Sequence, residues 1–115
     1  MVMHELAVTE SVLDIVRRHA AEAGAERVLR IHLVIGELSS IVDDSVQFYF
    51  DYLSRDTIAA GAELAFHRLA VGLICGACQH RWRPADADWT CPACGAASAR
   101  VEAGREFYVE SIEVE

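Results

Sequence analysis

The sequence predicts an α+β (α/β sandwich-like) fold: a small sheet with two helices on one face and a cysteine-rich insertion near the C-terminus. Three observations predict it. Apolar residues recur at helical spacing in two segments, and they alternate with polar residues in three others. All four cysteines lie between the second and third alternating segments. The order is therefore helix, strand, helix, strand, cysteine segment, strand, and we expect the last strand to return to the sheet.

The two helices are predicted over residues 6–23 and about 43–58. Gly24 is a suitable residue to end the first helix, because glycine readily adopts a positive φ. Asp43 and Asp44 fall in the first turn of the second helix, where the helix dipole favours carboxylates. The apolar residues at helical spacing are Leu6, Leu13, Val16 and Ala20 in the first segment and Val46, Phe50 and Leu53 in the second.

The three strands are predicted over residues 29–35, 64–67 and 107–114. In the first, Leu29, Ile31, Leu33 and Ile35 alternate with other residues, which is typical of a strand with one buried face. We expect residues 1–70 with 104–115 to form one α/β domain and residues 71–103, which contain all four cysteines, to form a second domain. His32 and His67 lie on the polar sides of the first two strands, so we expect them to be residues of the sheet surface rather than metal ligands.

Composition limits the classes of function. The chain has 115 residues, of which 53% are hydrophobic and 24% charged, and this favours a small globular protein. It has no apolar run of about 18 residues that could cross a membrane, and Glu5, Glu10 and Asp14 argue against a signal or transit peptide. We therefore expect a cytoplasmic protein. The net charge of −8 disfavours nucleic acid as a partner.

The cysteines form two CxxC pairs, Cys75 with Cys78 and Cys91 with Cys94, separated by 12 residues. Each pair can point two thiolates at one ion, so the two pairs supply a closed tetrahedral set. Two disulfides or a redox-active CxxC are the alternatives, but cytoplasmic thiols are kept reduced and two matched pairs favour metal. The pattern therefore predicts a structural zinc site in a zinc-ribbon-like module with two CxxC knuckles.

Several motifs together resemble the HypA/HybF family, the nickel-incorporation factors of [NiFe]-hydrogenase maturation. The resemblance extends over essentially the whole chain. Besides the paired CxxC motifs, the segments that carry it are Met3-His4-Glu5-Leu6, Ile35-Gly36-Glu37-Leu38-Ser39, Leu53-Ser54-Arg55, Gly61-Ala62-Glu63-Leu64, Gly104-Arg105-Glu106 and Ile112-Glu113-Val114-Glu115.

The resemblance implies a nickel metallochaperone that is not an enzyme. It implies that residues 1–70 with 104–115 form a nickel-binding α/β domain and that residues 71–103 form a zinc-binding domain. It implies delivery of Ni(II) to the hydrogenase large subunit, together with a HypB-type GTPase. It also implies that the Met-His-Glu motif binds nickel through the histidine imidazole and backbone nitrogens, which here makes His4 the central ligand. We expect no nucleic acid or membrane among the partners, and we include a homodimer among the expected assemblies.

The family motif begins at the initiator methionine, whereas Met1 and Val2 precede it here. Removal of Met1 would leave a chain that starts Val2-Met3-His4. The Val2 amine, the Met3 and His4 amides and the His4 imidazole could then bind Ni(II) in one plane.

In a chain that starts at Met3, the Glu5 amide is the candidate fourth ligand. The side chains of Glu5, Asp43 and Asp44 are candidates for positions around the metal. The alternative function is a zinc-ribbon module that binds nucleic acid or protein, with Arg81, Trp82 and Arg83 as its basic-aromatic patch.

Overall fold

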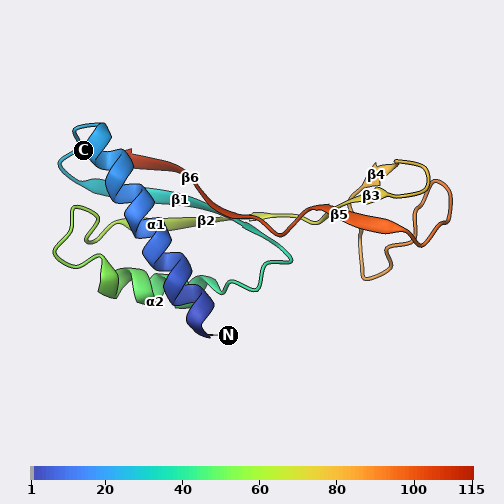
Figure 1. The fold of residues 1–115 in the computed structure, drawn as a ribbon, viewed down its shortest axis with the longest axis horizontal. Helices are drawn as coiled ribbons and strands as arrows, with labels where there is room; N and C mark the ends of the chain where they lie inside the picture. The colour runs from blue at the N-terminus through green and yellow to red at the C-terminus, as the bar shows by residue number, and fades with distance from the viewer. Residues whose placement is uncertain (1) are drawn as a thin grey trace. The chain divides into compact units, whose positions relative to one another are not determined.

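The computed structural model describes the backbone of residues 2–115 and the side chains from Glu5 onward. The elements, shown in Figure 1, are α1 (Val2–Glu22), β1 (Val28–Gly36), α2 (Asp43–Leu53), β2 (Glu63–Leu69), β3 (Gly72–Cys75), β4 (Arg81–Trp82), β5 (Ala99–Ala103) and β6 (Phe107–Val114). Within the described residues, neither helix is long and apolar enough to cross a membrane.

The chain divides into two compact units. The first contains the residues through Val34 together with Ser40–His67 and Phe107–Glu115, and the second contains Ile35–Ser39 and Arg68–Glu106. The second unit therefore includes residues 35–39, which are the last two residues of β1 and the three that follow it, together with residues 68–106.

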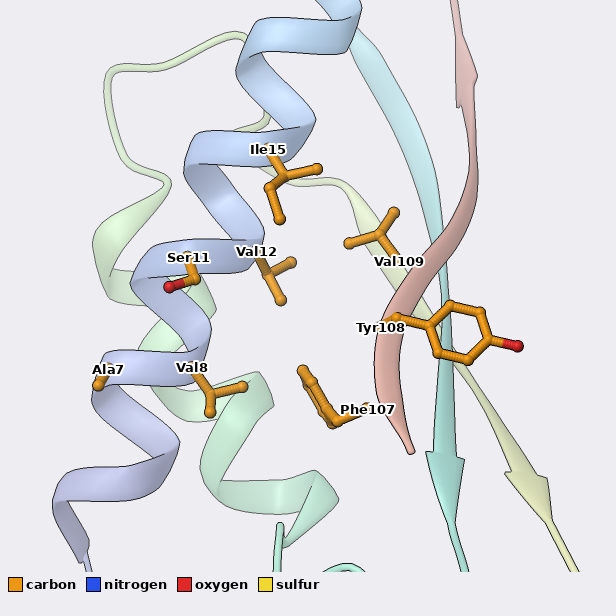
Figure 2. A pocket seen from close by; sticks show the side chains of 8 residues that line it. All are labelled: Ala7, Val8, Ser11, Val12, Ile15, Phe107, Tyr108 and Val109. Atoms are coloured by element: carbon orange, nitrogen blue, oxygen red, sulfur yellow. The ribbon is translucent and has the colours of Figure 1, made fainter. Parts of the chain in front are cut away.

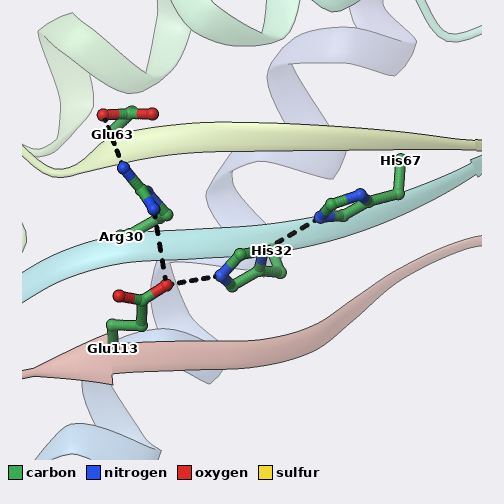
Figure 3. A network of polar contacts seen from close by, with 5 residues as sticks. All are labelled: Arg30, His32, Glu63, His67 and Glu113. Carbon is green, nitrogen blue, oxygen red and sulfur yellow. Dashed lines mark hydrogen bonds and ion pairs between the residues drawn. The ribbon is translucent and has the colours of Figure 1, made fainter.

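The first unit has the α+β architecture predicted from the sequence. Its sheet has the order β2-β1-β6, so the last strand does return to the sheet and lies next to β1. Helix α1 packs against both α2 and β6, and the two helices cover one face of the sheet (Figure 3). The fully buried side chains between these layers include Val16, Ile31, Leu33, Val46 and Phe50.

Strand β1 begins differently from the prediction. Leu29 is 41% exposed, whereas Val28 before it is 1% exposed. Ile31 and Leu33 then alternate as expected. The N–H of Val28 donates to the carbonyl oxygen of Ile58 at 2.9 Å, outside the sheet ladder. The first residues of the strand therefore do not follow the alternation of its middle.

Helix α2 ends at Leu53, five residues before the predicted end. The N–H of Ser54 still donates to Phe50 O, at 2.9 Å, but Asp56 has a φ of 64°. A left-handed residue interrupts a right-handed helix, and aspartate tolerates that conformation better than most residues. The Thr57 hydroxyl and N–H both donate to Ser54 O, which closes a turn in place of another helical turn.

The second unit contains a sheet that the sequence analysis did not predict, with the order β4-β3-β5. Both pairings are antiparallel, and Leu73 in the central strand lies opposite Trp82 and Val101. Leu73 is fully buried. These strands have only two to five residues, too few to produce a recognisable alternation.

Two glycines meet at a close backbone approach within the second unit. A Cβ on Gly36 would lie 2.1 Å from the carbonyl carbon of Gly104, and Gly104 has a φ of 125°. Backbone hydrogen bonds fix the approach. Gly36 N–H donates to Glu106 O at 2.7 Å, and Leu38 N–H donates to Gly104 O at 2.6 Å. The backbone here has no room for a side chain.

We predict that Gly36→Ala destabilises the protein by about 3 kcal/mol or more, at the upper end of overpacking changes, because the methyl group would overlap backbone atoms that cannot rotate away. Gly72→Ala is the matched control, since its Cβ would make an ordinary 3.4 Å contact with the Ala103 methyl group. Denaturant unfolding of both variants measures the difference, and equal midpoints would contradict the close approach.

Candidate metal centres

The four cysteines come together at one point in the second unit. Their sulfur atoms all lie within 4.8 Å of one another. The Cys75 and Cys94 sulfurs are 3.7 Å apart, as are those of Cys78 and Cys91. These distances are far longer than a disulfide bond. Zinc–sulfur bonds of about 2.3 Å place the sulfurs of a tetrahedral site about 3.8 Å apart, so the cluster suits a four-coordinate ion.

Two turns with the same hydrogen-bond pattern position the thiols. In the first turn, Cys75 N–H donates to His80 O at 2.9 Å and Gln79 N–H donates to Cys75 O at 2.9 Å. In the second, Cys91 N–H donates to Ala96 O at 3.0 Å and Gly95 N–H donates to Cys91 O at 2.8 Å.

Both turns contain a left-handed residue at the same position. Gln79 has a φ of 67° and Gly95 a φ of 77°. The two CxxC pairs are thus presented by one local structure that occurs twice.

The thiols of the cluster have opposite pKa shifts. A hydrogen bond from the Ser98 hydroxyl, helped by the backbone N–H groups of Cys78 and Ala77, lowers the pKa of Cys75 to about 6. The backbone N–H of His80 acts in the same direction on Cys78, but desolvation and the neighbouring cysteines raise the pKa of Cys78 to about 12. Four adjacent thiolates repel one another. A bound divalent cation would offset that repulsion.

The residues of the expected nickel site lie at the start of α1. The side chains of Val2, Met3 and His4 lie outside the described residues, so their contacts are not part of the structure. Glu5 is described, and it is only 7% exposed. Its Oε2 accepts a hydrogen bond from the N–H of Val42 at 3.3 Å.

This contact brings the starts of the two helices together. Val42 is the N-cap residue of α2 and has no side-chain cap of its own, and Asp43 and Asp44 form the first turn after it. The Glu5 carboxylate therefore lies at the positive end of the α2 dipole. Glu5, Asp43 and Asp44 were predicted as candidates for positions around the nickel ion, but a contact between the two helices was not predicted. An isolated glutamate gives no sequence signal for such a long-range cap.

An apolar groove lies between α1 and β6 in the first unit (Figure 2). Its lining contains two hydroxyl groups, those of Ser11 and Tyr108, and no carboxylate, imidazole or thiol. It is therefore not a metal centre. The other lining residues are Ala7, Val8, Val12, Ile15, Phe107 and Val109.

This chain is similar to proteins described as hydrogenase maturation factors of the HypA type. The family model for hydrogenase/urease nickel incorporation metallochaperones, HypA, matches residues 3–114. A Dehalococcoides mccartyi protein named hydrogenase maturation factor HypA is 45% identical over 113 residues, which cover 98% of this chain and 95% of that protein. A protein of the same name from Caldanaerobacter subterraneus is 40% identical over 114 residues, covering 98% and 100%.

Solved structures agree with these sequence comparisons. A solution structure of a HypA protein superposes with a TM-score of 0.81 at 25% identity, covering 98% of this chain and 97% of that one. The solution structure of the nickel metallochaperone HypA from Helicobacter pylori has the same fold, with a TM-score of 0.70 at 23% identity and 96% coverage of each chain.

We predict that Glu5→Ala destabilises the protein by about 1–3 kcal/mol, because Val42 N–H loses a charged acceptor and α2 loses a carboxylate at its positive end. Glu10→Ala, an exposed glutamate of the same helix, is the control and should change stability by less than about 0.5 kcal/mol. Chemical denaturation compares the two. A Glu5→Ala variant as stable as Glu10→Ala would rule out the capping role.

Proposed function

Because the chain belongs to the HypA family of nickel metallochaperones for hydrogenase maturation, we propose that it binds Ni(II) at the start of α1 and delivers it to a hydrogenase precursor. The observation that carries this proposal is the family match over residues 3–114, which includes the Met3-His4-Glu5 segment. The receiving protein on this proposal is the hydrogenase large subunit.

The proposed nickel ligands are the His4 imidazole and backbone nitrogens, with those of Val2, Met3 and Glu5 as candidates. Ni(II) accepts nitrogen ligands in square-planar geometry. Helix α1 starts at Val2, and the amides of a first helical turn have no carbonyl partner within the helix. This supports their use as ligands. The Glu5 carboxylate and the nearby first turn of α2, with Asp43 and Asp44, would surround the ion with negative charge.

The proposed ion at Cys75, Cys78, Cys91 and Cys94 is zinc. Four thiolates in tetrahedral arrangement favour zinc among the common divalent ions, and the 3.7 Å sulfur separations support this assignment. Four protein ligands leave no open position, so the ion would be structural. Its binding energy would stabilise a unit whose three strands are short.

We also propose that the protein is not an enzyme and that a HypB-type GTPase works with it. The sequence contains no GxxxxGK[ST] pattern, whose backbone N–H groups and lysine would bind nucleotide phosphates. Energy from nucleotide hydrolysis would therefore come from the partner. The chain would supply ligands and a surface that presents the nickel ion.

We predict one zinc ion per chain, lost in Cys91→Ser together with the protease resistance of residues 68–106. Structural zinc sites contribute roughly 10 kcal/mol or more of binding energy near pH 7, and binding weakens as the pH falls because protons compete for the thiolates. Elemental analysis and limited proteolysis measure both effects. His80→Gln is the control, since its ring stacks on Trp82 at 5.8 Å rather than joining the sulfurs. Full zinc occupancy in Cys91→Ser would argue against four-cysteine ligation.

We predict that His4→Ala abolishes tight Ni(II) binding and hydrogenase maturation while stability and zinc content stay nearly unchanged, because a residue near the chain start contributes little packing. Nickel titration and a maturation assay measure the loss. His19→Ala, which removes an exposed histidine near the other end of α1, should leave both intact. Unchanged nickel affinity in His4→Ala would place the tight site elsewhere.

The same titration distinguishes the candidate backbone ligands. Chains that start at Val2, start at Met3 or carry an N-terminal extension differ in how far the terminal amine lies from His4. Square-planar coordination gives a visible absorption band, and its formation requires loss of amide protons, so binding through these nitrogens should strengthen as the pH rises. Identical affinities and spectra in all three chains would exclude the terminal amine as a ligand.

A further inference from the structure

A row of polar side chains crosses the face of the first sheet that the helices leave open (Figure 3). One side chain comes from each strand: His67 from β2, His32 from β1 and Glu113 from β6. His32 Nδ1 lies 2.9 Å from His67 Nε2, and His32 Nε2 lies 2.7 Å from Glu113 Oε2. The central histidine ring therefore contacts a neighbour through each of its nitrogens.

Sheet geometry explains why these residues meet. Ile31 and Leu33 point into the buried layer, so His32 between them points to the open face. The strand order β2-β1-β6 then places the neighbours of His32 on either side of it. His32 and His67 were predicted on the polar sides of their strands, but local alternation does not reveal that their side chains meet.

Glu113 fixes which nitrogen of His32 carries a proton. Its hydrogen bond with His32, together with the charge of Arg30, lowers the pKa of the Glu113 carboxyl. An ionised carboxylate only accepts hydrogen bonds, so Nε2 of His32 must donate to it. In the neutral ring, Nδ1 then carries a lone pair, and it accepts from the Nε2–H of His67.

We propose that His32 and His67 form a second site, for a divalent transition-metal ion of the Ni(II), Cu(II) and Zn(II) class, with Nδ1 of His32 and Nε2 of His67 as its two protein ligands. Two nitrogens that share an ion at about 2.0–2.1 Å lie about 2.9–3.4 Å apart, depending on the angle at the metal, and here they are 2.9 Å apart. The ring centroids lie 5.2 Å apart with the ring planes 17° from parallel, so the two nitrogens face each other along the hydrogen bond, and both rings must turn their lone pairs toward the ion when it binds. Imidazole suits these ions.

Metal entry replaces one hydrogen bond and leaves the other in place. The Nε2 proton of His67 moves through water to Nδ1 of the same ring, so the neutral pair binds the ion without net proton release. The bond from His32 Nε2 to Glu113 remains, and Glu113 acts as a positioning residue that holds the ring and raises its basicity.

The charged groups around the pair are Glu113, Arg30 and Glu63. Arg30 lies 3.2 Å from Glu63 and 3.7 Å from Glu113, so the two carboxylates more than offset its positive charge.

The site differs from the cysteine cluster in being open. Two protein ligands leave the remaining positions to water or to a donor from another molecule, and His67 is exposed at the surface. The ion would therefore bind more weakly and exchange faster than in a closed four-ligand set. This proposal uses no residue of the start of α1, so it does not depend on the proposed role of His4.

The test is a Ni(II) titration of the zinc-loaded, full-length His4→Ala variant, in which NMR monitors the imidazole signals at each nickel concentration. An open nickel site with water ligands is paramagnetic, so the signals of His32 and His67 should broaden first. Those of His19 and His80, which lie outside the row, should broaden only at higher nickel concentration. Equal broadening of all four histidines, or no broadening of His32 and His67, would overturn the proposal.

Three further substitutions in the same background test the roles of individual residues. His67→Gln should remove the bound nickel equivalent, and Glu113→Gln should weaken it about 10-fold or more, whereas His19→Gln should leave it unchanged. Circular dichroism and zinc content check that each variant is folded. Nickel binding retained in folded His67→Gln would refute the site.

A further experiment separates the second site from the proposed nickel site at His4. In a chain with His4 intact, the pair His32→Gln and His67→Gln should leave the tight nickel site and its absorption band unchanged. Loss of tight binding in that chain would mean that the two histidines belong to the primary site, and the proposal of a second site would fail.

Discussion

The central strand β1 carries the constraint on which the first unit depends. A strand must send successive side chains to opposite faces. Because β1 is paired with a strand on each edge, its pairing register decides at once which residues point to each face. Ile31 and Leu33 supply the contact surface for the helices, while Arg30 and His32 supply the charged row on the other face. A shift of one residue in register would bury the arginine and the histidine and expose the core. The hydrophobic core and the surface chemistry are thus set by a single choice of register.

The sequence predicted those features whose cause is local. Period-two alternation identified β1, helical spacing identified both helices, and the CxxC spacing identified the cysteine cluster. Features that depend on distant residues were not predictable in this way. The contact between Glu5 and Val42 joins residues 37 positions apart, and the pair His32 and His67 depends on which strands are neighbours. Strands β3, β4 and β5 are so short that an alternation of apolar and polar residues within them cannot be distinguished from chance.

Errors at element ends have a similar explanation. The second helix was predicted to extend to about residue 58, but α2 ends at Leu53 and the left-handed conformation at Asp56 prevents a further helical turn. In the same way, Val28 is buried instead of Leu29 because the start of β1 bonds to the segment after α2 as well as to its own sheet. Local periodicity describes the middle of an element well. Its ends are decided by neighbouring backbone groups.

The repeated turns at the cysteines have an entropic consequence. Each turn is closed by its own two backbone hydrogen bonds, so each pair of thiols can be oriented without the other pair. A divalent cation at this cluster would be held by Cys75, Cys78, Cys91 and Cys94, which the turns present as two preformed pairs. Ring closure costs less entropy when each half is already ordered. The chain would consequently lose less conformational freedom on binding an ion than a segment in which all four thiols had to be positioned independently.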